Sequence, residues 1–298
     1  MSPTSPVTLD VAVLGVGLWA DGLGTWDQAR ARWRADQAPQ VPHTPEVQVV
    51  LARPQTTLLP PAERRRAPAT VLLALAVAEQ ACRQAGLAPR QLRSVFSSAH
   101  GDLELTDYLC STLAEAPEHL SPTKFHHSVH NAASGYWTIG VGNMQASTAI
   151  SAGPHSFAQG LLEAATQVVC EQAPVLLVAY DMPAPRPLVP ITQSTALVGL
   201  ALVLAPVADL AQDHHSAPML ALQLRDSTTH GLHDAPLAGD PDAVALMTRS
   251  PMAAGLPLLK ALADFHQLAG PSFQGRFPLS PAQSLILTLN ERNHDHRR

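Results

Sequence analysis

Residues 142–162 read GNMQASTAISAGPHSFAQGLL, a stretch in which a short strand runs through small residues directly into a helix. We expect the strand over 145–151 and the helix over 155–172, which places the turn residues at the N-terminus of that helix. Backbone N–H groups at such a terminus favour an anion or a developing oxyanion. A strand–turn–helix segment of this kind, called the elbow below, is also a common position for a catalytic nucleophile.

The polar side chains of the elbow are Ser151, Ser156 and His155. A serine and a histidine adjacent in sequence rarely have the geometry for proton transfer between them. We therefore interpret the serines as structural caps of the turn. An acyltransferase or hydrolase that uses Ser156 with His155 stays open as an alternative.

Strands and helices alternate on both sides of the elbow, which predicts a layered α/β fold. PVLLVAY (174–180) and residues 196–206 are continuous apolar runs, typical of strands buried on both faces. Further expected strands are 10–17, which should end in a turn at Gly15 and Gly17, 93–99 and 282–289. Expected helices are 25–35, 70–86, 104–115 and 252–268. Two stretches predict irregular structure: the Pro-rich loop 36–67 and a surface excursion over 208–251.

Composition excludes several classes of protein. Of the 298 residues 46% are apolar and 14% charged, which indicates a globular chain rather than a disordered one. The chain has a formal charge of −5 and therefore lacks the excess of basic residues that neutralises phosphates, so nucleic acid is not an expected partner. The longest apolar run, 196–207, is shorter than the roughly 20 residues of a bilayer span. The three cysteines form no C-x-x-C pair, and a cytoplasmic protein is expected.

A dinucleotide-binding turn is one alternative for the N-terminal strand. Gly15, Gly17 and Ala20 satisfy G-x-G-x-x-[GA]. Such a turn needs a helix to begin at once, whereas Gly22 and Gly24 occupy the first helical turn. We interpret the glycines as structural.

A metal site is the alternative for three clustered histidines. His126 and His130 are four positions apart, the spacing that presents two imidazoles on one helix face, and His127 lies between them. Pro122 and Ser128 argue against a long helix there, and no H-E-x-x-H motif occurs. We expect no metal and interpret these histidines as partly buried, bonding to backbone at an interface.

Several segments resemble β-ketoacyl synthases in a consistent order over about residues 10–207. They are VAVLGVGLWADGLGTWDQARARW (11–33), ALAVAEQACRQAGL (74–87), VFSSAHGDL (95–103), HNAASGYWTIG (130–140) and STAISAGPHSFAQGLLEA (147–164). Asn131 and Gly135 match the P-N-x-A-x-G block of that family. The resemblance implies a single thiolase-like domain over 1–298, with its N-terminal core in 10–207 and a much abbreviated C-terminal half that remains in 252–290.

The departures from the family pattern concern its catalytic residues. Where an active ketosynthase has T-A-C, this chain reads Ser151-Ala152-Gly153, so Gly153 stands at the position of the nucleophilic cysteine. Without a thiolate the chain cannot carry an acyl thioester there. No H-G-T-G-T block occurs, because His230-Gly231 continues as Leu-His, and no G-H follows Lys260. The resemblance therefore implies a subunit with no catalytic residue and no cofactor.

A ketosynthase-like chain without catalytic residues is similar to a chain-length factor. The stretch FHHSVHNAASGYW (125–137) resembles those of aryl polyene and xanthomonadin-type pigment pathways in particular. This implies a heterodimer with an active ketosynthase that elongates chains on acyl carrier protein, with side chains from this subunit closing the acyl tunnel. The implied tunnel or interface residues are Tyr108, Leu109, Thr112, Leu113, Phe125, His126, His130, Asn131, Tyr136 and Trp137. A homodimeric scaffold that binds acyl chains or acyl carrier protein is the other alternative.

Overall fold

The computed structural model describes residues 7–35, 54–208, 210, 214, 216–227, 237, 240–265 and 273–290. The strands are β1 (Thr8–Ala20), β2 (Gly24–Thr25), β3 (Arg93–Ser97), β4 (Ser147–Ile150), β5 (Val175–Asp181), β6 (Val198–Pro206), β7 (Met219–Asp226), β8 (Phe273–Pro278) and β9 (Gln283–Asn290). The α-helices are α1 (Trp26–Ala35), α2 (Pro61–Arg66), α3 (Ala69–Ala85), α4 (Leu103–Glu115), α5 (Pro122–His127), α6 (Ala132–Val141), α7 (Ser156–Glu171), α8 (Val189–Thr192), α9 (Pro241–Met247) and α10 (Leu256–Asp264). Short 3₁₀ helices are η1 (Pro89–Gln91), η2 (Pro117–His119), η3 (Gly153–His155) and η5 (Pro251–Gly255).

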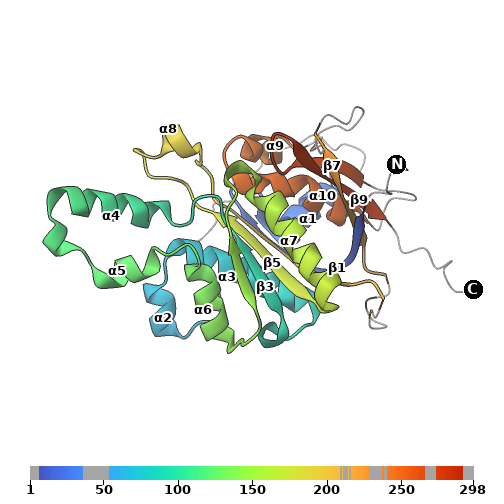
Figure 1. The fold of residues 1–298 in the computed structure, drawn as a ribbon, viewed down its shortest axis with the longest axis horizontal. Coiled ribbons are helices and arrows are strands. Elements are labelled where there is room, and N and C mark those ends of the chain that lie inside the picture. The colour runs from blue at the N-terminus through green and yellow to red at the C-terminus, as the bar shows by residue number, and fades with distance from the viewer. Residues whose placement is uncertain are drawn as a thin grey trace, which may run out of the picture.

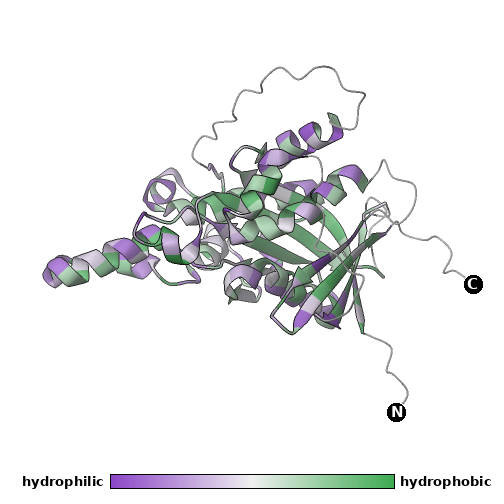
Figure 2. Cartoon of the chain, turned by 90° about the horizontal axis from the view of Figure 1, so that it is seen from above, coloured by the Kyte–Doolittle hydropathy of each residue, from purple (hydrophilic) through white to green (hydrophobic). Residues whose placement is uncertain are grey.

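One mixed sheet runs through the molecule in the order β4-β3-β5-β6-β1-β7-β9-β8, with β2 paired to β1. Strands β4, β3 and β5 are parallel, and the pairings from β5 to β8 are antiparallel. Helices lie on both faces of the apolar strands, as Figures 1 and 2 show. The layered α/β fold expected from the alternation of elements is thereby confirmed.

The position of strand β5 inside the sheet explains why its sequence is apolar throughout. All seven of its residues are buried. Val175, Leu177 and Ala179 contribute to the core on the side of α7 and α10, and Leu176 and Val178 contribute to the core beneath α3 and α6. A strand covered on both faces loses the polar alternation of a half-exposed strand. The expectation for 174–180 is confirmed.

The N-terminal strand is longer than expected, because β1 continues through Gly15 and Gly17 and the chain turns only at residues 21–23. Both glycines lie under α3. A Cβ on Gly15 would lie 2.1 Å from the carbonyl oxygen of Ala81, and one on Gly17 would lie 2.1 Å from that of Val77. The glycines therefore permit a close helix–strand approach. The expected turn at this position is wrong, and neither glycine opens a helix as a dinucleotide-binding turn requires.

The loop and the excursion expected from the sequence contain regular elements. Residues 61–66 of the Pro-rich stretch form α2, with Pro61 in the first turn where its missing N–H costs nothing. Residues 36–53 lie outside the described residues. Within 208–251, β7 pairs with both β1 and β9, and α9 follows it. The alternation of Leu220, Leu222 and Leu224 is the two-residue period that the expectation overlooked.

The C-terminal part differs from the expectation in two further places. The expected helix 252–268 is divided into η5 and α10, and Pro257 occupies the first turn of α10. Strand β8 was not expected, and it pairs with β9 at the edge of the sheet. The described chain after β6 contributes three strands to the sheet, β7, β8 and β9, whereas the chain up to β6 contributes the other six. Within the described residues, no helix combines the length and hydrophobicity that crossing a membrane requires.

Candidate functional site

The elbow has the local structure that its sequence predicts. Strand β4 ends at Ile150, η3 spans the turn, and α7 begins at Ser156. Gly153 has a φ of +55°, in the left-handed region that glycine adopts without a Cβ penalty. No atom lies within 4 Å of the position that a Cβ on Gly153 would occupy. The turn thus retains space for a side chain at Gly153, although the residue carries none.

Ser156 is a structural cap rather than an accessible hydroxyl. Its side chain is fully buried, and its Oγ donates to the Gly153 carbonyl at 2.7 Å and accepts from the Ala152 N–H at 2.8 Å. These two bonds close the turn around Gly153. The interpretation of Ser156 as structural is confirmed, although its hydroxyl closes the turn and the N-cap position of α7 is His155. A nucleophilic role would disrupt these bonds.

Ser151 also bonds to backbone, because its Oγ donates to the Ala99 carbonyl at 3.0 Å. Among the described residues, neither Ser151 nor Ser156 makes a hydrogen bond to a histidine. A serine nucleophile needs a base within hydrogen-bond reach. The elbow therefore lacks the pairing that the acyltransferase or hydrolase alternative needs.

A buried carboxyl group lies beside the elbow, at the end of β5. Asp181 is 1% exposed, and its two oxygens accept from Ser98 Oγ at 2.6 Å and from the Ala99 N–H at 3.3 Å. Burial raises the pKa of Asp181 to about 7, against the lowering effect of its bonds to Ser98 and to backbone. The sequence analysis did not identify this residue. The sequence feature that could have identified Asp181 is its position directly after the apolar run 174–180.

The loop of residues 98–102 runs from the surroundings of Asp181 to the start of α4. The ring of His130 lies 3.1 Å from the Ser98 carbonyl, which is the backbone bond expected for this histidine. Asp102 accepts from Thr70 Oγ1 at 2.7 Å and from the Leu105 N–H at 2.9 Å, and so caps α4. The loop is held by α3, β5, the elbow and the segment before α6.

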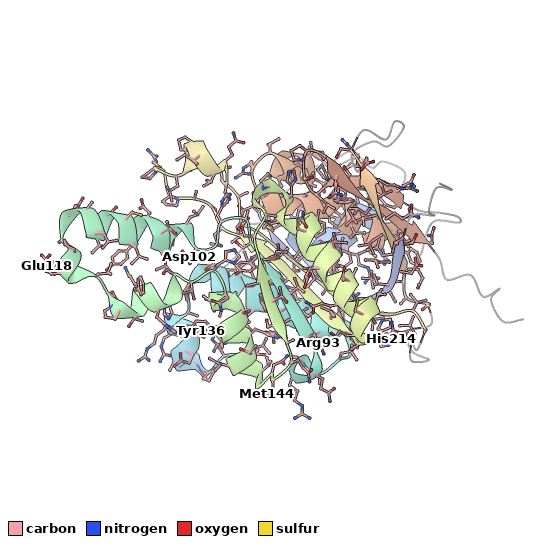
Figure 3. The ribbon with its side chains drawn as sticks, viewed as in Figure 1. Arg93, Asp102, Glu118, Tyr136, Met144 and His214 are labelled. Atoms are coloured by element: carbon pink, nitrogen blue, oxygen red, sulfur yellow. The ribbon has the colours of Figure 1, made fainter. Side chains whose placement is uncertain are left out.

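Helices α4 and α5 form a hairpin, residues 103–127, which extends away from the body of the molecule (Figure 1). We call this hairpin the arm. Asp102 marks its base and Glu118 its tip in Figure 3. Within α4 and α5, which the structure describes completely, only Leu103 is buried. Leu113 and Phe125 are 56% and 59% exposed. The arm thus presents apolar side chains that the body of the chain does not cover.

Side-chain contacts hold the two helices of the arm together and tie α5 to α6. The Lys124 ammonium lies 3.4 Å from the centroid of the Tyr108 ring, a cation–π contact between α5 and α4. The Tyr136 hydroxyl and His127 Nε2 are 3.0 Å apart. Burial, followed by the neighbouring His126, lowers the pKa of His127.

The structure distributes the predicted tunnel and interface residues over the helices α4, α5 and α6 and the segment between α5 and α6. The arm carries Tyr108, Leu109, Thr112, Leu113, Phe125 and His126. His130 and Asn131 lie just before α6, and Tyr136 lies within that helix. Trp137 is different. It is fully buried and packs against Phe96, with ring centroids 6.3 Å apart. The helical period of α6 turns Trp137 toward the sheet, so it offers no surface for a direct interface contact in this structure, and its assignment to the tunnel or interface stays a prediction.

The three clustered histidines do not all lie on one element of the fold. His126 lies in α5, whereas His130 follows the end of that helix, so the two do not share a helix face. No group of three or more potential metal-ligating side chains is found in the part of the chain that the structure describes.

Comparison with known proteins agrees with this architecture. The family described as β-ketoacyl synthase, N-terminal domain, matches residues 26–247. A ketosynthase in complex with its chain length factor from Xenorhabdus doucetiae is similar with a TM-score of 0.63 and 22% identity, over 94% of this chain and 99% of that one. The ishigamide ketosynthase/chain length factor is similar with a TM-score of 0.66 and 14% identity, over 95% and 99%.

A type II polyketide synthase acyl-carrier protein in complex with its ketosynthase bound to the hexaketide is similar with a TM-score of 0.71 and 11% identity, over 96% and 100% of the two chains. No curated protein matches the chain. The structural likenesses establish a thiolase-like ketosynthase fold, and the family match covers most of the chain. The chain belongs to the β-ketoacyl synthase family, through its N-terminal domain.

Proposed function

We propose that this chain is a non-catalytic chain-length-factor subunit that pairs with an active β-ketoacyl synthase and shapes its acyl tunnel. The observation that carries the proposal is the elbow, which keeps an open left-handed position at Gly153 but presents no side chain there. By resemblance, this is the position of the family's nucleophilic cysteine. Condensation would then take place on the partner's cysteine.

The remaining groups of the elbow support the same conclusion. Ser156 is fully buried and engaged in two hydrogen bonds, and Ser151 bonds to the Ala99 carbonyl. Acyl transfer through a hydroxyl needs an adjacent base to remove its proton. His230 and Gly231, which continue as Leu-His where the family has H-G-T-G-T, lie outside the described residues.

The arm supports the pairing with a second protein. Its apolar side chains Leu113 and Phe125 are more than half exposed, and in the proposed complex the partner would cover them. Two of the similar solved structures are described as a ketosynthase with its chain length factor. A ketosynthase is therefore the partner that we propose for the arm.

The surface beside the arm offers a second means of association. Strand β4 lies at the edge of the sheet, and Ser147 and Ala149 are exposed there. A free strand edge can pair with the edge of another chain. Ile139 and Met144, which flank this edge, are 84% and 94% exposed. The proposed partner surface thus extends from the arm across the end of α6 to β4.

In the proposed complex, side chains of the arm limit product length by steric exclusion. The tunnel candidates are Tyr108, Leu109, Thr112, Leu113, Phe125 and His126. A bulky group at the floor of an apolar pocket discriminates against each further methylene by about 1–3 kcal/mol. The finer assignment, to aryl polyene or xanthomonadin-type pigment synthesis on acyl carrier protein in the cytoplasm, rests on the sequence resemblance of residues 125–137.

The test is native mass spectrometry of the chain co-expressed with the cysteine-containing ketosynthase encoded nearest to it. We expect a one-to-one complex that extends malonyl-loaded carrier protein. Tyr108→Ala should lengthen the product, whereas Lys124→Met, which removes only the cation facing that ring, should leave product length unchanged. A chain that forms homodimers, beside a ketosynthase that is fully active alone, would favour the scaffold alternative and contradict the proposal.

A further inference from the structure

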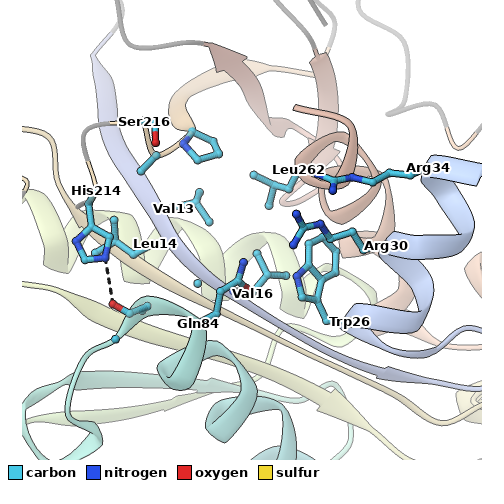
Figure 4. Close-up of a pocket in the computed structure, with 15 residues that line it drawn as sticks. Val13, Leu14, Val16, Trp26, Arg30, Arg34, Gln84, His214, Ser216 and Leu262 are labelled. Atoms are coloured by element: carbon cyan, nitrogen blue, oxygen red, sulfur yellow. Dashed lines mark hydrogen bonds between the residues drawn. The ribbon is translucent and has the colours of Figure 1, made fainter. Parts of the chain in front are cut away.

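A cavity of about 460 Å³ lies on the side of the molecule away from the arm, between α1, β1, the end of α3 and α10 (Figures 1 and 4). Its floor is apolar, with Val13 and Val16 of β1 and Leu262 of α10. His214 stands on the opposite wall, where its ring bonds to the Ala85 carbonyl at 3.1 Å. A cavity of this size is typical of small-molecule sites.

Two arginines on one face of α1 make the cavity cationic. Arg30 and Arg34 are four positions apart in the sequence, and both side chains line the cavity and are half-buried (Figure 4). Arg34 Nε donates to the Ala263 carbonyl at 3.0 Å, which fixes its guanidinium. Arg30 has no hydrogen-bond or ion-pair partner among the described residues, and none of the described residues that line the cavity is acidic. This cationic hollow occurs in a chain with a net charge of −5.

The cavity also contains polar groups without protein partners. Trp26 is 5% exposed and lines the cavity, and its indole N–H has no acceptor in the described part of the chain. Gln84 uses its Oε1 to accept from the Val16 N–H at 2.8 Å, which leaves its amide NH₂ for another acceptor. A buried donor without an acceptor costs free energy, so native structures rarely leave a buried donor without a hydrogen-bond partner.

We propose that this cavity binds a small molecule that carries a phosphate or carboxylate group beside a short apolar segment. The planar guanidinium fork of Arg30 matches either oxyanion, with Arg34 as the second cation. The indole N–H of Trp26 and the amide of Gln84 would donate to the same ligand, and Val16 and Leu262 would contact its apolar part. This site is independent of the proposed pairing with a ketosynthase, because none of its residues lies in the arm or β4.

The experiment is isothermal titration calorimetry of the full-length chain with hexyl phosphate, hexanoate and inorganic phosphate, with ionic strength kept constant by sodium chloride. We expect saturable binding of at least one alkyl probe, weakened about tenfold or more by Arg30→Gln. Trp26→Phe, which keeps the ring but removes the N–H donor, should weaken the same probe. Arg65→Gln removes an exposed arginine of α2 outside the cavity and should change nothing.

The three probes distinguish the sources of the oxyanion. Preference for hexyl phosphate identifies a phosphorylated ligand, and preference for hexanoate identifies a carboxylate, and either result supports the proposal. Saturable binding that Arg30→Gln leaves unchanged would overturn it, as would the absence of saturable binding of all three probes in the millimolar range. Circular dichroism of each variant shows whether the fold is retained, and Arg30→Lys, which keeps the charge but not the fork, should fall between the wild type and Arg30→Gln.

Discussion

The Ser98 hydroxyl donates a hydrogen bond to a carboxyl oxygen of Asp181, with 2.6 Å between the two oxygens. This buried bond lies where the loop that leads to the arm leaves the sheet. The Ala99 N–H reaches the second oxygen of the same carboxyl group at 3.3 Å. Asp181 thus fixes the loop whose other end, Asp102, caps the first helix of the arm. The loop that leads to the arm is thus anchored on a carboxyl group whose pKa burial raises to about 7, so that it is only partly ionised near neutral pH.

The protonation of Asp181 makes stability depend on pH. Burial raises its pKa from 3.8 to about 7, so between these values the folded chain binds a proton that the unfolded chain has released. The contribution of Asp181 to the free energy of unfolding therefore falls as pH rises from about 4 to about 7. Asp181→Asn mimics the neutral form of the carboxyl group at every pH. As pH rises, the free energy of unfolding of the wild type should therefore fall relative to that of the variant. Urea unfolding of both proteins at about pH 5 and about pH 8 measures this shift, and an unchanged difference would contradict it.

Gly17 should tolerate no side chain. A Cβ there would lie 2.1 Å from the Val77 carbonyl oxygen, and backbone of α3 cannot move aside as a flexible side chain can. Gly17→Ala should therefore lower the free energy of unfolding by about 1–3 kcal/mol or more. Gly135→Ala is the matched control, since Gly135 lies inside α6 with no atom within 4 Å of its Cβ position. That substitution should stabilise the chain by about 0.5–1 kcal/mol. Equal effects of the two variants in thermal unfolding would refute this account of β1.

The sequence predicted the elements whose hydrophobic period is simple. The apolar run of β5 and the stripe of α3 that ends at Gly86 both form as expected, because a strand or helix covered by the core leaves a direct pattern. Strand β7 was missed although Leu220 and Leu222 alternate, because the segments before and after it are polar and show no sustained period. Short, isolated strands depend on long-range pairing, here with β1 and β9, which no local window contains.

The site was predictable to the extent that it depends on local chemistry. The elbow follows from small residues between a strand and a helix, and its serine cap from ordinary turn chemistry. The burial of Trp137 was not predicted, because a matched sequence block does not by itself show which face of the helix a residue occupies. Asp181 was missed because its partners Ser98 and Ala99 are more than 80 residues away in sequence. Only the sheet, in which β3 and β5 are neighbours, brings them together.

Restoring a thiol at the elbow should not restore catalysis. Gly153→Cys places a side chain in open space at a φ of +55°, which should cost about 1–2 kcal/mol of stability. Gly142→Cys, at a φ of +63° with no atom within 4 Å, is the matched control for that strain. In a complex whose ketosynthase carries alanine for its own cysteine, neither variant should support malonyl condensation, because a thiol supplies no base. Product formation by the Gly153→Cys complex alone would show that the elbow retains a complete catalytic site.

The exposed phenyl ring of the arm should contribute to association but not to folding. Phe125 is 59% exposed, so Phe125→Ser removes little buried surface and should leave the melting temperature of the isolated chain unchanged. If the arm contacts a ketosynthase, the same change should raise the Kd of the complex about tenfold or more, as truncation of an aromatic anchor does. Val244→Ser alters a 49% exposed residue of α9, outside the arm, and should leave the Kd unchanged. Equal Kd values for the two variants in biolayer interferometry would place the partner's contact elsewhere than on the arm.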